Sequence, residues 1–361
     1  MSTRRVPARA AEIPSAIQFT RSDRDVARAL ADTLGQLDLR RPLVAFGQRA
    51  RALLGSSILI DLGPRLPCTP LAVGGGTIEE AERIRTAVVE AGSDAVVGVG
   101  GGRTIDVAKY AAFLAGVPFL AVPTQASHDG ICSPVAVLRG PGDARASSYG
   151  ARPPAALAVP LHAITAAPRE TIVSGIADLA SNVLAVKDWE WAHQFHGDSF
   201  DDYSALLARS AAELMIGRRE LYRPDREFDD EDVEVLVHGL ALSGLAMTIA
   251  GSSRPCSGPE HLVSHAFDWL GLGEGSHGQQ VSVGSTLAAR FFDADSARML
   301  ELLVNVGAPL TPAEVGIGHD DALRAVRMAH LVRPERHSRL AAALVADPDF
   351  VIEQAEAAWF H

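Results

Sequence analysis

Short apolar runs alternate with amphipathic stretches along residues 40–160 of the chain. The runs are mostly β-branched and bounded by glycine or proline, which is typical of buried strands. We predict strands at LVAF (43–46), SILIDL (57–62), LAV (71–73), AVVGV (95–99) and FLAV (119–122). Between them, residues 78–91 and 104–115 have the apolar spacing of helices. This order predicts parallel βαβ units, and so an α/β domain of the nucleotide-binding type.

Beyond about residue 166 the apolar pattern lengthens into helical windows, and prolines at 153, 154, 160 and 168 interrupt the junction. The helical windows are 176–193, 202–216, 230–250 and 257–270. We therefore predict an α/β dinucleotide-binding domain over residues 1–166 and an α-helical metal- and substrate-binding domain over residues 167–361. The first 15 residues are expected to form a loose arm.

The composition narrows the class of protein. A length of 361 residues favours two domains over one, and 47% hydrophobic with 21% charged residues excludes a disordered chain. The net charge of −11 argues against a partner such as nucleic acid or an anionic membrane, so any anionic ligand must bind in a local pocket. Three cysteines, no apolar leader and no membrane span predict a cytoplasmic protein.

Two glycine clusters follow predicted strands. GVGGGRTID (98–106) opens a helix, where free backbone N–H groups and the helix dipole favour an anion. The dinucleotide fingerprint GxGxxG is incomplete because Arg103 replaces its third glycine, so a diphosphate site and a plain tight turn both remain open. For VGGG (73–76), which acids follow closely, a plain turn and helix start is favoured. The polar loop 124–130 follows a strand at the edge where parallel sheets bind ligands, although an ordinary turn fits it too.

Histidines and one carboxylate form the sharpest pattern. His261 and His265 are four residues apart and share a helix face, His277 follows within GSHG, and Asp178 begins a helical segment. A catalytic metal site needs about three such protein ligands plus an open position. A histidine pair at this spacing is more often a surface or core feature, so spacing alone does not select the ligands.

Several strings together resemble the sn-glycerol-1-phosphate dehydrogenases, within the wider superfamily of glycerol dehydrogenase, iron-type alcohol dehydrogenase and dehydroquinate synthase. They are the segment from GVGGGRTID to CSPVA (98–136), GIADLASNVLAVKDWEWAH (175–193), GSSRPCSGPEHLVSHAFD (251–268) and HGQQVSVG (277–284). The resemblance covers residues 96–284 and implies a dehydroquinate synthase-like fold with the active site between two domains. Homo-oligomers are common in that family.

The resemblance also assigns residues. It implies that NAD(H) or NADP(H) is bound by Gly100, Gly101, Gly102, Arg103, Thr104, Ile105, Asp106, Thr124, Gln125, Ala126, Ser127 and Ser133. One divalent metal, zinc first and nickel or iron as alternatives, is expected at Asp178, His261 and His277. His265 and Asp129 are the expected catalytic residues. The role of Lys109, which completes the pattern GGGxxxDxxK, stays open.

The implied activity is the reversible NAD(P)H-dependent reduction of dihydroxyacetone phosphate to sn-glycerol 1-phosphate. The substrate is expected to contact Asp129, Asp178, Ser252, Ser253, Arg254 and His265. In GSSRP (251–255) the serine hydroxyls and the guanidinium suit a phosphate, although a solvated arginine in a loop is the alternative. No acid follows the strand 43–46 and Arg49 and Arg51 lie beyond it, so the sequence permits NADPH.

Three other functions remain open. One is a dehydrogenase of the same family acting on another polyol or polyol phosphate, since Gln279, Cys256 and Pro259 depart from the usual motifs. Another is a cyclase of the dehydroquinate synthase type, against which Asp178 argues because those enzymes use Glu there. The third is a non-catalytic nucleotide-binding protein.

Overall fold

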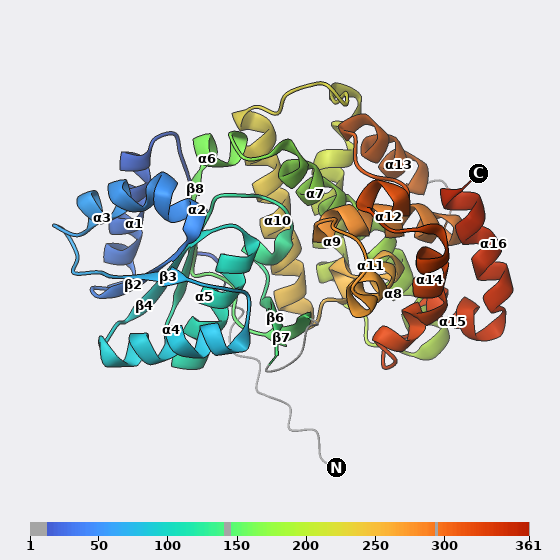
Figure 1. Cartoon of the computed structure of the whole chain (residues 1–361), viewed down its shortest axis with the longest axis horizontal. Coiled ribbons are helices and arrows are strands. Elements are labelled where there is room, and N and C mark those ends of the chain that lie inside the picture. Colours follow the sequence, from blue (N-terminus) through green and yellow to red (C-terminus); the bar gives the residue numbers. More distant parts are fainter. Residues whose placement is uncertain (1–12, 141–145, 293–294, 361) are drawn as a thin grey trace, which may run out of the picture.

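A six-stranded parallel sheet forms one half of the computed structural model, and packed helices form the other half (Figure 1). The structure describes residues 13–140, 146–292 and 295–360. From edge to edge the strands are β1 (Ile17–Thr20), β8 (Ala156–Pro160), β5 (Phe119–Pro123), β4 (Ala95–Gly100), β2 (Pro42–Gly47) and β3 (Thr69–Val73). This confirms the predicted α/β class with a helical second half.

Helices cover both faces of the sheet because successive apolar residues of a buried strand point to opposite faces. In β2, Leu43 and Ala45 belong to the apolar cluster that contains α4 and α5, whereas Val44 and Phe46 belong to the cluster on the opposite face. The covering helices are α1 (Asp23–Gln36), α2 (Gln48–Ala50), the π-helical η1 (Arg51–Gly55), α3 (Ser56–Leu62), α4 (Ile78–Glu90), α5 (Gly102–Ala115) and α6 (Leu161–Thr165).

Four of the five predicted strands are confirmed, as β2, β3, β4 and β5, and both predicted helices of this half are α4 and α5. The strand predicted at 57–62 is wrong, because these residues form α3. Ile58 and Leu62 are fully buried while Ile60 is 69% exposed, which is the spacing of one helix face. The sequence pattern missed β1, β8 and the antiparallel ribbon of β6 (Val135–Arg139) and β7 (Ala146–Gly150).

The helical half contains most of the predicted windows. Windows 202–216 and 230–250 coincide with α9 and α10, window 257–270 begins two residues early, and window 176–193 is divided at Ser181. The long helices are α7 (Arg169–Ala180), α8 (Asn182–His196), α9 (Asp202–Ile216), α10 (Asp230–Ala250), α11 (Pro259–Leu270), α12 (His277–Ala288), α13 (Asp295–Val306), α14 (His319–Val332), α15 (Arg339–Ala346) and α16 (Pro348–Trp359).

One apolar cluster spans the two halves. The largest buried cluster extends from Leu43 in the sheet to Leu303 in α13, so the predicted domain boundary at residue 166 stays a prediction. Residues 1–12, most of the expected arm, lie outside the described residues. By length and composition α10 could cross a membrane, but half of that window is buried here, and α10 packs against α9 in the centre of the molecule (Figure 1).

Candidate metal and cofactor site

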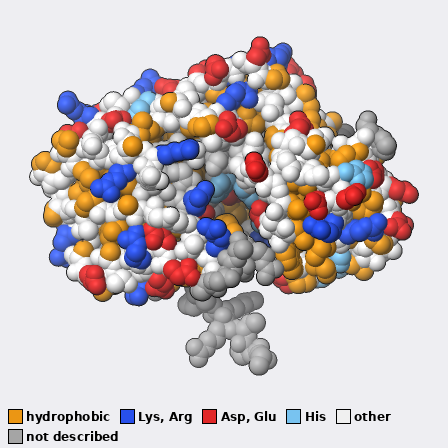
Figure 2. Space-filling view, in the orientation of Figure 1, with side chains coloured by type: hydrophobic (Ala, Val, Ile, Leu, Met, Phe, Trp, Pro, Cys, Tyr) orange, Lys and Arg blue, Asp and Glu red, His pale blue; other side chains and the backbone are white. Residues whose placement is uncertain are grey.

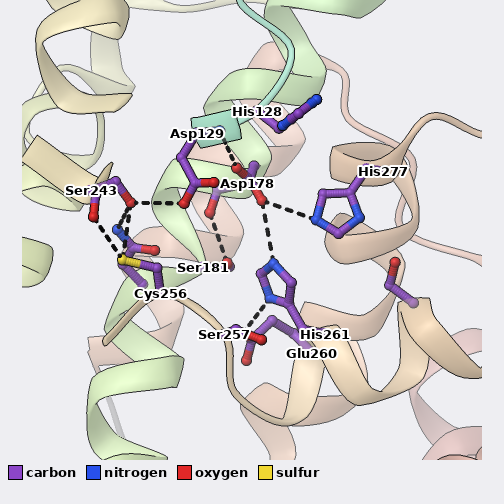
Figure 3. A network of polar contacts seen from close by, with 12 residues as sticks. His128, Asp129, Asp178, Ser181, Ser243, Cys256, Ser257, Glu260, His261 and His277 are labelled. Carbon is purple, nitrogen blue, oxygen red and sulfur yellow. Dashed lines mark hydrogen bonds and ion pairs between the residues drawn. The ribbon is translucent and has the colours of Figure 1, made fainter. Parts of the chain in front are cut away.

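Three side chains from three helices meet in the helical half. Asp178 lies on α7, His261 lies on α11, and His277 is the first residue of α12. Asp178 Oδ1 is 3.4 Å from His261 Nε2 and 3.6 Å from His277 Nε2, and the three candidate ligand atoms lie within 4.8 Å of one another (Figure 3). One carboxylate and two imidazoles suit a divalent transition metal, with positions left for exogenous oxygen ligands.

Glycines allow these helices to approach closely. A Cβ at Gly278, next to His277, would lie 2.0 Å from the carbonyl oxygen of Ser174 on α7. A Cβ at Gly284 would lie 2.3 Å from the carbonyl oxygen of Glu260, next to His261. Larger residues would therefore push α12 away from both α7 and α11, and the ligand atoms would separate.

The electrostatics of the trio favour an anionic carboxylate. Burial alone would raise the pKa of Asp178, but the interaction with His261 and the charge of His277 lower it to about 2. Burial also opposes protonation of His261, yet Asp178 and Glu260 together raise its pKa to about 9. The backbone N–H of Asp129 donates to Asp178 Oδ2 at 2.9 Å, which leaves Oδ1 facing the imidazoles. A cation is thus the natural occupant of this position.

Glu260 orients one of the ligands, and the sequence analysis did not single it out. Its buried Oε1 lies 2.8 Å from His261 Nδ1 and accepts a 2.7 Å hydrogen bond from the backbone N–H of Gly258. A carboxylate at Nδ1 keeps the proton on that nitrogen and leaves the Nε2 lone pair free for a metal. The available signal was an acid immediately before the first histidine of the pair.

Replacing Glu260 by Gln is expected to weaken metal binding by about 10-fold or more, because the imidazole loses its anionic partner. Zinc affinity measured by competition with a chromogenic chelator checks this result. Glu79→Gln, at the start of α4 and far from the trio in the sequence, is the control and should bind zinc as the unmodified protein does. Equal affinity in Glu260→Gln and the control contradicts the assigned role.

The expected catalytic residues lie beside the trio. Asp129 Oδ2 accepts from the Ser243 hydroxyl at 3.2 Å, and burial followed by the charge of Asp178 raises the pKa of Asp129 to about 8. His265 accepts a 3.2 Å hydrogen bond from Arg333 Nη2 at its Nε2 atom. Burial and the positive charge of Arg333 hold the pKa of His265 well below its ordinary value. His265 is therefore a neutral imidazole.

A cavity of about 1560 Å³ joins these groups (Figure 2). Histidine side chains are visible in the hollow between the two halves, with basic side chains beside them. The predicted site residues that line it are Arg103, Asp106, Asp129, Ser133, Ser252, Ser253, His261, His265 and His277. Other lining residues that the sequence analysis did not assign to the site include His128, Ser148, Ser257 and Arg333.

The glycine-rich segment lies where β4 ends and α5 begins. Gly101 is the N-cap of α5, and no side chain caps this end of the helix. A Cβ at Gly101 or Gly102 would lie 2.4 Å from Gln125 Oε1 or His128 Nε2, so a larger residue at either position would require that side chain to move. The arrangement suits close approach of a diphosphate to helix N–H groups. Thr104 and Thr124 adjoin Gly100 at this turn, and the backbone N–H of Thr124 donates to the carbonyl oxygen of Gly100 at 2.9 Å. Ser127 lies nearer α7, where its carbonyl oxygen accepts from the Ser174 hydroxyl at 2.8 Å. The side chains of Ile105 and Ala126 lie in the apolar core, so any cofactor contact at these two positions would have to come from their backbone.

Sequence comparisons identify relatives of this chain. The family model for iron-containing alcohol dehydrogenase matches residues 21–168. A glycerol-1-phosphate dehydrogenase, NAD(P)+, of Pyrococcus furiosus is 38% identical over 82% of this chain and 85% of its own length. The chain belongs to the glycerol-1-phosphate dehydrogenase family. A relative of the same name from Nitrosopumilus maritimus is also 38% identical, over 73% of this chain and 72% of its own length.

Solved structures agree on the fold of this family member. A probable glycerol dehydrogenase from Sinorhizobium meliloti superposes with a TM-score of 0.75 at 23% identity, covering 95% of this chain and 98% of its own. Glycerol dehydrogenase from Schizosaccharomyces pombe gives a TM-score of 0.73 at 21% identity, covering 95% of this chain and 91% of its own. These similarities confirm the predicted fold, in which an α/β half precedes a helical half.

In this member of the glycerol-1-phosphate dehydrogenase family, the structure disfavours two contacts that the sequence analysis expected. They are the cofactor contact of Asp106 and the phosphate contact of Arg254. Asp106 was expected to bind the cofactor, but its Oδ1 accepts from Lys109 at 3.1 Å and its Oδ2 accepts from the Val137 N–H at 3.2 Å. Lys109, whose role was open, is fully buried and also donates to the carbonyl oxygens of Gly130 and Val135. The pair holds η2 (Asp129–Ile131) and β6 against α5, which favours a structural role for Asp106.

Arg254 does not line the cavity as expected for a phosphate ligand. It lies in the short helix η4 (Arg254–Cys256), with its Nη1 atom 3.6 Å from Asp188 and its Nη2 atom 3.5 Å from Asp198. Because two carboxylates already neutralise this guanidinium, the expected phosphate contact at Arg254 is disfavoured. Ser252 and Ser253, by contrast, do face the cavity.

Proposed function

We propose that this protein catalyses the reversible NAD(P)H-dependent reduction of dihydroxyacetone phosphate to sn-glycerol 1-phosphate, with one divalent metal at Asp178, His261 and His277. The observation that carries the proposal is one cavity lined both by His261 and His277 of this ligand set and by Arg103 in the first turn of α5. The names of relatives at 35–38% identity support the same reaction.

Residues of the protein would orient the metal ligands and bind the substrate. Glu260 orients His261, and the Asp129 backbone orients Asp178, so that three ligand atoms point to one position. When bound there, the metal would act as a Lewis acid on the substrate oxygen while the nicotinamide supplies or accepts hydride. Asp129 and His265 line the same cavity and would hold the hydroxyl and carbonyl oxygens of the substrate by hydrogen bonds. No nucleophilic serine or cysteine is required.

The finer identities of metal and cofactor are part of the proposal. Zinc is expected, with nickel and iron as alternatives, because one carboxylate and two imidazoles suit all three. NADPH is expected to serve as well as NADH, since β2 ends at Gly47 without an acid, and the exposed Arg49 and Arg51 follow it. A cytoplasmic location and a homo-oligomeric state stay predictions from the sequence.

The test is oxidation of NADPH and NADH with dihydroxyacetone phosphate, using protein stripped by a chelator and reloaded with Zn²⁺, Ni²⁺ or Fe²⁺. We expect no turnover by the stripped protein and restored turnover after reloading, highest with zinc. Binding of nucleotide without turnover under every metal would reject dihydroxyacetone phosphate as substrate. Other phosphorylated ketones and the cyclase substrate would then be tried.

A further inference from the structure

Two arginines from the segment after α14 stand beside the cavity. Arg333 lines it, and its Nη2 atom donates to Ser148 Oγ at 3.2 Å and to His265 Nε2 at 3.2 Å. Arg336 donates to Ser257 Oγ at 2.9 Å and to Ser253 Oγ at 2.8 Å. Both guanidinium groups therefore contact side chains that themselves line the cavity.

The two arginines lack a directly paired carboxylate among the described residues. Within the part of the chain that the structure describes, neither forms an ion pair with a carboxylate, whereas Arg254 nearby faces two. Glu335 lines the cavity but is exposed and forms no ion pair with either arginine among the described residues. Burial and the charge of Arg333 lower the pKa of Arg336 to about 9, although the more distant charges of Asp188 and Glu335 oppose this shift. A cationic pair withdrawn from water calls for an anionic ligand.

The serine hydroxyls are oriented for the same ligand. Ser148, Ser253 and Ser257 each accept a hydrogen bond from an arginine, and among the described residues none of the three hydroxyls donates to a protein acceptor. Each hydroxyl proton is thus free to point into the cavity that all three line. A guanidinium fork with three hydroxyl donors matches the oxygens of a phosphate.

We propose that Arg333 binds the phosphate group of the substrate, together with Ser148, Ser253 and Ser257, and that Arg336 is a positioning residue behind two of these serines. This assignment rests on the proposed function, and it moves the phosphate contact from Arg254 to the segment 333–336.

The position relative to the metal ligands agrees with a small substrate. Arg333 contacts His265, whose ring centroid is 6.1 Å from those of both His261 and His277. One side chain therefore separates the anion position from the ligand trio. In dihydroxyacetone phosphate a single CH2–O link separates the carbonyl carbon from phosphorus. The carbonyl and the phosphate would occupy the two positions together.

The experiment compares dihydroxyacetone phosphate with unphosphorylated dihydroxyacetone at one fixed cofactor, in Arg333→Ala, Arg333→Lys and the unmodified protein. For Arg333→Ala we expect kcat/KM to fall about 100-fold with the phosphorylated ketone and much less with dihydroxyacetone, because only the lost contact with His265 affects both ketones. Arg333→Lys should recover part of the loss. Arg324→Ala, which removes an exposed arginine paired with Asp321 on α14, should match the unmodified protein with both ketones.

Calorimetry with inorganic phosphate separates this proposal from the proposed function. Phosphate should bind the zinc-loaded protein and the Arg324→Ala control, and should fail to bind Arg333→Ala folded to the same circular dichroism spectrum. If the unmodified protein does not reduce dihydroxyacetone phosphate but phosphate binding still requires Arg333, the anion site stands and the proposed substrate falls. Equal losses of kcat/KM with both ketones, or phosphate binding that survives Arg333→Ala, would overturn the proposal.

Discussion

Asp178→Asn is expected to lower kcat with dihydroxyacetone phosphate by about 1000-fold or more and to remove the bound metal. Asparagine keeps the size of the side chain but loses the negative charge that faces His261 and His277 at 3.4 Å and 3.6 Å. The measurement pairs steady-state turnover with metal content after dialysis, so that a loss of metal is separated from a loss of folding.

The control for this prediction is Asp349→Asn, which changes an exposed carboxylate near Arg327. It should retain one metal per chain and unchanged turnover. An Asp178→Asn protein that keeps stoichiometric zinc and most of its turnover would show that Asp178 is not a ligand.

Lys109→Met is expected to reduce the free energy of unfolding by about 3–5 kcal/mol. The ammonium group is fully buried, and its loss would leave the Asp106 carboxylate without its cationic partner and two carbonyl oxygens without their donor. Urea denaturation followed by circular dichroism measures the change. The unfolding slope should stay the same if only the native state is affected.

A double variant isolates the buried charge. Asp106→Leu combined with Lys109→Met removes both charges, so the double variant should be more stable than Lys109→Met alone. A loss below about 1 kcal/mol in Lys109→Met would contradict the structural role given to this pair.

The strands of the sheet were predictable where a short apolar run lay between segments with helical spacing. Runs such as 95–99 lie between glycine-bounded helical segments, and buried strands are the usual result. The run 57–62 misled because six apolar-rich residues fit either a strand or a helix, and only burial of Ile58 and Leu62 on one face decides for the helix. The edge strand β1 has too few apolar residues to stand out, and it is fixed by its pairing with β8.

The candidate site was likewise predictable only in part. Spacing brought His261 and His265 to one helix face but did not show which faces Asp178, because that depends on the contact between α7, α11 and α12. Close packing at Gly278 determines that contact, and nothing in the sequence distinguishes this glycine from others in the chain. Arg254 was favoured for phosphate because it adjoins two serines, whereas Asp188 and Asp198, distant in sequence, neutralise it in the fold.

The most direct measurement is the configuration of the product formed from dihydroxyacetone phosphate by the zinc-loaded protein with NADPH. Chiral analysis of the glycerol phosphate, beside authentic sn-1 and sn-3 standards, is the readout. The proposed function predicts the sn-1 enantiomer alone, formed at a rate that matches NADPH oxidation. Formation of the sn-3 enantiomer, a racemate, or no glycerol phosphate would contradict it.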